Sequence, residues 1–263
     1  MNEKLRIGAL ISGGGTNLQA IIDDCESGAI DGKLAFVGSD NPEAKGLARS
    51  RKHDIPHFVV DYGRIIRDYR KNPYETELPG DFDLADITAK QTLFSRDESP
   101  AKMETFLITR AIAEAGLLEA MSSYPFDLLV LAGFMRTLTP YFIDRVNRDG
   151  VKKIMNIHPA LLPSFPGTDG YGDTLRYGCK VGGCTVHFID YGEDTGPIIG
   201  QRAYAIDPDD SIDSIQKKGL QLEWELYPAC IQLFARDRLR IETLSHRLPG
   251  GKQMQRTVVK ILP

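Results

Sequence analysis

Apolar and polar positions along this chain follow two patterns, that of short buried strands and that of amphipathic helices. Apolar runs typical of strands occupy residues 5–12, 34–40 and 57–61. Residues 18–27 have the apolar spacing of a helix, with Gly28 where a left-handed C-cap belongs, and a second helix is predicted over 42–54. This alternation predicts parallel strands joined by crossover helices.

The segment from about Tyr62 to Gln91 interrupts the alternation. It is rich in charged residues, tyrosine and proline, with one possible helical turn and no clear period. A connection between parallel strands does not need this length. We therefore interpret residues 62–91 as an inserted excursion or lid, whose aromatic and apolar side chains favour docking against the body over disorder.

The regular pattern resumes after the excursion. Strands are predicted at 126–134, 152–158, 183–190 and 198–206, and helices at 100–121, 140–147, 173–177 and 209–237. No internal repeat or low-complexity tract divides the chain. The pattern predicts an α/β fold in a single domain spanning residues 1–263, with a mostly parallel central sheet and helices on both faces.

Composition narrows the class of protein. With 42% hydrophobic and 26% charged residues the chain is ordinary for a globular protein, and a net charge of −4 argues against a general nucleic-acid binder. The N-terminus lacks the apolar core of a signal peptide, and no run reaches the roughly 18 apolar residues of a membrane span, so we expect a cytoplasmic protein. The cysteines form no CxxC pair, so we expect them to be reduced and to bind no metal.

A glycine-rich turn, ISGGGTN at residues 11–17, joins the first predicted strand to the first helix. Such a turn exposes backbone N–H groups at a helix N-terminus, where the helix dipole favours an anion. It therefore predicts a site for a phosphate or a carboxylate. The turn is neither GxGxxG nor a Walker loop, so it specifies neither a dinucleotide nor a nucleoside triphosphate. The alternative is a tight turn that binds nothing.

Asn156 and His158 end the predicted strand 152–158, directly before a proline-rich loop. Side chains alternate along a strand, so these two point to the same face, at the edge where open α/β sheets bind ligands. An amide and an imidazole that converge there can both donate to one developing oxyanion. The alternative is a pair of structural polar residues at a strand end.

An acidic loop follows the predicted strand 183–190 and carries Asp190, Glu193 and Asp194. A carboxylate in this loop can pair with His158, favour its charged form and hold its orientation. A solvated acidic loop is the alternative. His187, inside the strand, either supports the cluster by a hydrogen bond or is packed in the core.

Four stretches, ISGGGTNLQAII, LAGFMRTL, NIHPALLPSFPG and GCTVHFIDYGEDTGPII, have the order and approximate spacing of the phosphoribosylglycinamide formyltransferase family. The chain resembles this folate-dependent family from about Leu5 to Thr243. The resemblance implies a Rossmann-like formyltransferase fold. It also implies formyl transfer from 10-formyltetrahydrofolate, as co-substrate, to the amine of glycinamide ribonucleotide without a metal. Small-molecule substrates, no nucleic-acid or membrane partner, and a monomer or homodimer are expected.

The resemblance also implies roles for individual residues. The catalytic trio is matched by Asn156, His158 and Asp194. The cradle for the substrate phosphate is matched by Gly15, Thr16 and Asn17, and a glutamate near the substrate amine by Glu223. The folate pocket is matched by Arg96, Met135, Arg136, Thr137, Leu138 and Asn156.

Two departures from the family pattern lie outside the trio. The excursion is longer than the family's usual connection and precedes Arg96. Residues 168–175 read TDGYGDTL where relatives commonly have a histidine-bearing helix start, and Gly170 and Gly172 should loosen that turn. The rival functions are a 10-formyltetrahydrofolate hydrolase, a formyltransferase with a different amine acceptor, and a non-catalytic folate- or nucleotide-binding regulator. The intact phosphate cradle argues against the hydrolase, and the complete trio argues against the regulator.

Overall fold

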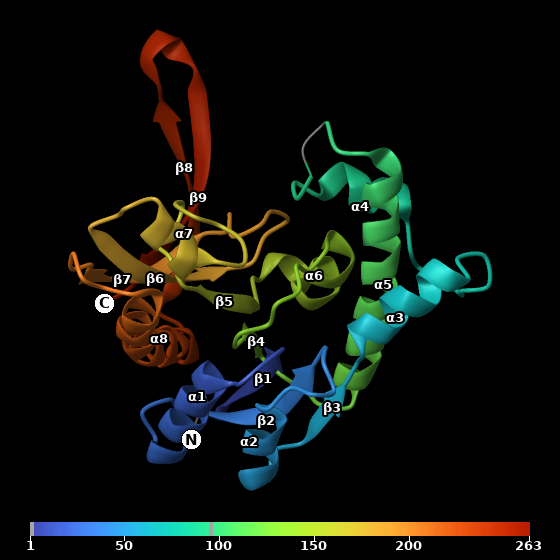
Figure 1. Cartoon of the computed structure of the whole chain (residues 1–263), viewed down its shortest axis with the longest axis horizontal. Helices are drawn as coiled ribbons and strands as arrows, with labels where there is room; N and C mark the ends of the chain where they lie inside the picture. The colour runs from blue at the N-terminus through green and yellow to red at the C-terminus, as the bar shows by residue number, and fades with distance from the viewer. Residues whose placement is uncertain (1–2, 95–96) are drawn as a thin grey trace.

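A seven-stranded sheet in the order β3-β2-β1-β4-β5-β6-β7 forms the centre of the molecule (Figure 1). The computed structural model describes residues 3–94 and 97–263, the side chain of Asp149 excepted, so Arg96 lies outside the described residues. The strands are β1 Leu5–Ile11, β2 Gly32–Ser39, β3 His57–Val59, β4 Leu128–Leu131, β5 Ile154–His158, β6 Val181–Phe188 and β7 Ile198–Ala205. β1 to β5 pair in parallel, whereas β6 is antiparallel to both of its neighbours. The predicted mostly parallel sheet is confirmed.

Helices cover both faces of the sheet, as predicted (Figure 1). The helices are α1 Thr16–Ser27, α2 Leu47–Lys52, α3 Tyr62–Lys71, α4 Leu84–Lys90, α5 Pro100–Ser122, α6 Pro140–Val146, α7 Gly170–Arg176 and α8 Ile212–Ala235. Side chains alternate across β1: Ile7 and Ile11 belong to the core beneath α1 and α8, while Leu10 belongs to the core beneath α5 and α6. Among the described helices, none has both the length and the apolar content needed to cross a bilayer.

The excursion is more regular than the sequence analysis predicted, because it contains α3 and α4. Asp61 caps α3 by accepting a hydrogen bond from the Arg64 backbone N–H, and the following Tyr62 is fully buried. The apolar positions of α3 do have helical spacing, but the arginines and aspartates between them made this spacing hard to recognise in the sequence. The expected docking is confirmed, since Ile87 of α4 packs in a cluster with Leu107 of α5 and Tyr141 of α6.

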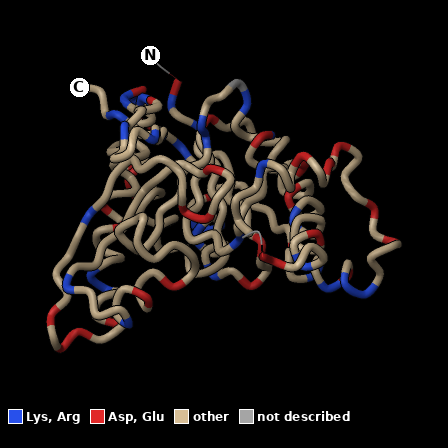
Figure 2. Tube along the Cα trace, turned by 90° about the horizontal axis from the view of Figure 1, so that it is seen from above, with Lys and Arg blue, Asp and Glu red and all other residues tan. Residues whose placement is uncertain are grey.

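A two-stranded hairpin after α8 was missed by the sequence analysis, which predicted no strand beyond residue 206. β8 (Leu239–Arg247) and β9 (Gln253–Ile261) pair over nine residues, joined by the 3₁₀ turn Pro249–Gly251, and project from the body (Figure 1). Most of their side chains are exposed on both faces, so the strands lack the apolar run that marks a buried strand. Figure 2 shows acidic and basic positions interspersed around the described trace.

Candidate active site

A cleft of about 450 Å³ opens at the carboxyl ends of β1, β4 and β5. This is the edge at which open α/β sheets bind ligands. The cleft brings together every predicted site residue that the structure describes. They are Gly15, Thr16, Asn17, Met135, Arg136, Thr137, Leu138, Asn156, His158, Asp194 and Glu223.

The glycine-rich turn forms one end of the cleft. Gly15 is the N-cap residue of α1 and has a left-handed backbone, with φ of 67°. A Cβ at Gly15 would come within 3.0 Å of the Gly46 backbone, so both the angle and the space favour glycine. No side chain caps α1 in the described structure, and its first turn carries no acidic residue. The N–H groups of this helix start are therefore suited to bind an anion.

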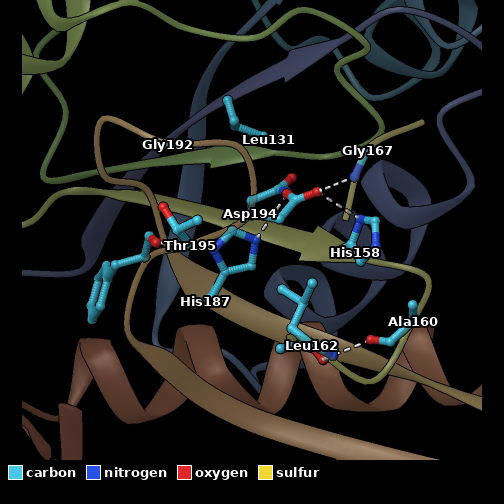
Figure 3. Close-up of polar contacts among 12 residues, drawn as sticks. Leu131, His158, Ala160, Leu162, Gly167, His187, Gly192, Asp194 and Thr195 are labelled. Carbon is cyan, nitrogen blue, oxygen red and sulfur yellow. Dashed lines mark hydrogen bonds and ion pairs between the residues drawn. The ribbon is translucent and has the colours of Figure 1, made fainter. Parts of the chain in front are cut away.

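Asp194 is the centre of the polar cluster at the end of β5 (Figure 3). Its Oδ2 lies 3.2 Å from His158 Nδ1 and accepts a hydrogen bond of 2.8 Å from the Gly167 backbone N–H. Its Oδ1 lies 3.5 Å from His187 Nε2. Burial raises the pKa of the Asp194 carboxyl, but the His187 contact, the charge of His158 and the Gly167 N–H together bring it below its ordinary value. Asp194 is therefore an anion at neutral pH.

His158 has an acceptor at each ring nitrogen. Nδ1 faces the Asp194 carboxylate, and Nε2 lies 2.7 Å from the carbonyl oxygen of Phe165, in the proline-rich loop. Only the imidazolium can donate to both acceptors at once. The alternative of a solvated acidic loop is excluded for Asp194, whose side chain is only 11% exposed.

Asn156 and His187 extend the cluster. Asn156 Nδ2 lies 3.3 Å from His187 Nε2, and His187 Nδ1 lies 3.0 Å from the Phe188 carbonyl oxygen. His187 Nε2 thus lies near both the Asn156 amide and Asp194 Oδ1, and the ring tautomer decides whether Nε2 accepts from the amide or donates to the carboxylate. Fully buried His187 therefore both packs in the core and orients the cluster.

A second polar cluster also lines the cleft, around the buried carboxyl of Glu223. Asn17 Nδ2 donates to Glu223 Oε2 at 2.7 Å, and the Tyr171 hydroxyl donates to Oε1. Burial raises the pKa of Glu223, whereas these two hydrogen bonds oppose that rise. Asn17 Oδ1 is buried and has no hydrogen-bond partner among residues 3–94 and 97–263.

Residues 133–138 form one wall of the cleft. Gly133 has φ of 78°, and its carbonyl accepts a hydrogen bond of 3.0 Å from the Ser12 N–H. Ser12 Oγ in turn accepts from the Met135 N–H at 2.7 Å. The Arg136 side chain forms an ion pair with buried Asp40. These contacts hold the wall against the glycine-rich turn.

Arg110 of α5 is a buried charged residue that the sequence analysis missed, and it lies outside the lining of the cleft. It is 8% exposed, and its Nε and Nη1 have no partner in the described structure. Its guanidinium lies 5.4 Å from the centre of the Tyr62 ring, and that of Arg136 lies 5.7 Å from the same centre. The available signal was an arginine at a helical position surrounded by apolar residues.

The expected loosening of the turn at residues 168–175 was wrong. Asp169 caps α7 by accepting a hydrogen bond from the Gly172 N–H at 3.2 Å, so the helix begins there with Gly170. A Cβ on Gly170 would lie 2.8 Å from the Pro159 carbonyl oxygen and 3.2 Å from His158 Nε2. The glycine therefore lets α7 approach the end of β5 closely.

The described part of the chain contains no group of three or more His, Cys, Asp or Glu side chains arranged to hold a metal ion. The cleft instead combines a helix start suited to an anion, the polar side chains of Asn156 and His158 beside an anionic carboxylate, and the wall of residues 133–138. This combination suits a reaction in which a carbonyl oxygen gains negative charge.

Comparison with known proteins identifies relatives of this arrangement. A family model described as "Formyl transferase" matches residues 5–231. The phosphoribosylglycinamide formyltransferase of Haemophilus influenzae is 34% identical over 237 residues, which are 90% of each chain, and that of Bacillus subtilis is 31% identical over 84% of this chain and 90% of its own. The crystal structure of glycinamide ribonucleotide transformylase 1 from Symbiobacterium toebii matches with a TM-score of 0.71 at 34% identity, covering 100% of this chain and 96% of its own.

Proposed function

Since this chain belongs to the formyl transferase family, we propose that it transfers the formyl group of 10-formyltetrahydrofolate to the amine of glycinamide ribonucleotide. This reaction is a step of purine biosynthesis. The observation that carries the proposal is the single cleft in which an anion-binding helix start faces the Asn156–His158–Asp194 cluster. A phosphate-bearing amine bound at the helix start would lie in the same cleft as that cluster.

In the proposed reaction the amine attacks the formyl carbon and gives a tetrahedral intermediate with a negatively charged oxygen. Asn156 donates a hydrogen bond to that oxygen, and the imidazolium of His158 does so when its Nε2–H exchanges the Phe165 carbonyl oxygen for the substrate oxygen. Loss of one such donor typically costs ~3 kcal/mol of transition-state stabilisation. Asp194 orients His158, stabilises its charge and helps pass the proton from the attacking nitrogen to the leaving nitrogen through water. The bond between the formyl carbon and N10 then breaks, which releases tetrahydrofolate and the formylated amine. The proposed reaction uses hydrogen bonds alone to activate the carbonyl.

The two substrates occupy opposite parts of the cleft in this proposal. The backbone N–H groups of Gly15 and Thr16 bind the phosphate, with Asn17 beside them, and Glu223 lies near the amine-bearing part of the substrate. The folate lies along Met135, Arg136, Thr137 and Leu138 and reaches Asn156. Holding both reactants in one geometry converts a bimolecular step into one that is effectively unimolecular.

The expected folate contact of Arg96 stays a proposal from family resemblance.

We also propose that the enzyme is cytoplasmic, acts on small-molecule substrates as a monomer or a homodimer, and has no nucleic-acid or membrane partner. The formyl transferase family uses a formyl-folate co-substrate, and we propose that its 10-formyl form serves here.

A product assay distinguishes the proposed transferase from the rival hydrolase. The purified protein is incubated with 10-formyltetrahydrofolate, with and without glycinamide ribonucleotide, and both formate and formylated product are measured. We expect consumption of the folate only when the amine is present, with one formylated product for each folate consumed. Equal release of formate in both reactions would instead identify a hydrolase. Product from another amine alone would identify a different acceptor.

A further inference from the structure

Tyr171 lies in the segment where the chain departs from its relatives' pattern, and its ring packs closely against α8. A Cβ on Gly219 of α8 would lie 2.3 Å from Tyr171 Cε1 and 2.6 Å from its hydroxyl oxygen. Glycine at position 219 therefore makes the space that the ring occupies. In this position the hydroxyl reaches Oε1 of Glu223 in the cleft.

Tyr171 and Asn17 together satisfy both oxygens of Glu223. Asn17 donates from its amide nitrogen to Oε2 at 2.7 Å, since a carboxylate oxygen that carries no proton can only accept a hydrogen bond. The Asn17 oxygen then points away from the carboxylate. This oxygen is buried and lacks a donor in the described structure, although Asn17 lines the cleft. A buried acceptor without a partner calls for a donor from a ligand.

We propose that Tyr171 is a positioning residue for acceptor specificity. It fixes Glu223, and through Glu223 the Asn17 amide, so that Asn17 Oδ1 accepts a hydrogen bond from a hydroxyl or amide N–H of the amine substrate. The inference rests on the proposed function. Asn17 directly follows Thr16 at the helix start, so the donor lies beside the substrate phosphate. The Asn17 side chain thus accepts a hydrogen bond from a donor of the substrate, while backbone N–H groups bind the substrate phosphate.

The charge state of Glu223 controls this arrangement. The other titratable groups described near it are Tyr171, Tyr204 and Cys184; burial raises the pKa of Tyr204 and of Cys184 to about 12 each, and that of Tyr171 is raised further. All three are neutral near pH 7, so the hydrogen bonds from Asn17 and Tyr171 are the contacts that oppose the rise in the Glu223 pKa caused by burial. Without the Tyr171 hydroxyl, the pKa of Glu223 rises further. A protonated Glu223 can donate to Asn17 Oδ1 and occupy the acceptor.

The test compares the full-length wild type with Tyr171→Phe, with Tyr171→His as a rescue variant that restores a donor, and with Tyr124→Phe as a control. Tyr124 is half-buried in an aromatic cluster with Phe36 and Phe58. For Tyr171→Phe we expect KM for glycinamide ribonucleotide to rise about fivefold to tenfold, the usual worth of one hydrogen bond. KM for the folate and kcat should stay within about twofold. As the pH is lowered, KM for glycinamide ribonucleotide should begin to rise at a higher pH in Tyr171→Phe than in wild type. Tyr171→His should reverse most of the increase in KM, and Tyr124→Phe should behave as wild type.

Two substrate analogues identify the donor. One lacks the ribose hydroxyls, and the other is methylated at the glycosidic amide nitrogen. The analogue that lacks the donor should bind the wild type more weakly than glycinamide ribonucleotide does. Its affinity for Tyr171→Phe should be little lower than its affinity for the wild type.

Three results would overturn the inference: an unchanged KM for the amine substrate in Tyr171→Phe, an equal rise in both KM values, or a pH profile identical to wild type. A wild type that does not formylate glycinamide ribonucleotide refutes the proposed function itself. An active wild type with an unaffected Tyr171→Phe variant refutes only the role of Tyr171.

Discussion

Asp194 combines a buried anion with a left-handed backbone. Its φ is 53°, a region that Asp and Asn tolerate better than most residues. This conformation directs the carboxylate toward His158, His187 and the Gly167 N–H in the cleft (Figure 3). Asparagine is therefore the substitution that removes the charge with the least disturbance of the backbone.

We expect Asp194→Asn to lower kcat near pH 7 by about tenfold or more, because a neutral amide neither holds the orientation of His158 as firmly nor balances positive charge on its ring. Steady-state kinetics with both substrates measures this effect. An unchanged kcat in the folded variant would refute the pairing.

The same variant has a signature in stability. The folded-state pKa of Asp194 is lowered, so the carboxylate contributes stability above its unfolded pKa of about 4, and this contribution is lost as pH falls through the lower folded value. Wild type and Asp194→Asn should therefore differ in free energy of unfolding at pH 6 and converge below about pH 4. A difference independent of pH would contradict an ionic role.

Residue-level prediction from the sequence succeeded where one strand or one turn sets the geometry. Asn156 and His158 share a face because side chains alternate along β5, and the pattern alone shows this. The contact between Asn17 and Glu223 joins residues 206 positions apart, and no local pattern encodes it. Arg110 was missed for the same reason, since its nearness to Arg136 depends on how α5 packs.

At the scale of elements, the approach of α7 to the end of β5 depends on Gly170. We expect Gly170→Ala to push α7 away from Pro159 and His158, because its Cβ would lie 2.8 Å from a backbone oxygen. Overpacking of this kind typically costs about 1–3 kcal/mol, and a misplaced His158 should lower kcat by about tenfold or more. Thermal unfolding and steady-state kinetics measure the two effects.

Gly80→Ala is the matched control, since a Cβ there meets nothing within 4 Å. An active and stable Gly170→Ala would show that α7 can shift without consequence for the site.

Elements with buried apolar patterns were predicted well, and elements with polar surroundings were not. The strands of the central sheet and the helix α5 carry long apolar stretches, so the predictions came within a few residues. The apolar positions of α3 are few among charged residues, although its Tyr62 is fully buried. β8 and β9 pair mainly with each other, so their side chains need no continuous apolar face.

At the scale of the whole molecule, the excursion has an anchored part and a free tip. Tyr62 and Ile87 are buried in the body, whereas Tyr74 in the connecting loop is fully exposed. We expect replacement of residues 73–79 by a glycine-serine linker of equal length to leave both stability and kinetics close to wild type. Tyr62→Ala should instead lower stability by about 3–5 kcal/mol, the usual cost of deleting a buried aromatic side chain.

Chemical denaturation and kinetics with both substrates measure these effects. A loss of kcat in the linker variant with an unchanged KM would show that the tip contributes to catalysis. A stable Tyr62→Ala variant would show that the excursion is not anchored through its first helix.

The central claim is that Asn156 and His158 stabilise the oxyanion formed during formyl transfer. The most direct measurement is the rate at which a ¹³C-labelled formyl carbon of 10-formyltetrahydrofolate appears in formylated glycinamide ribonucleotide, compared among wild type, Asn156→Ala and His158→Ala. We predict that each variant keeps its fold, by circular dichroism and thermal unfolding, and loses at least about 100-fold in kcat. Near-normal transfer by either folded variant would contradict the account.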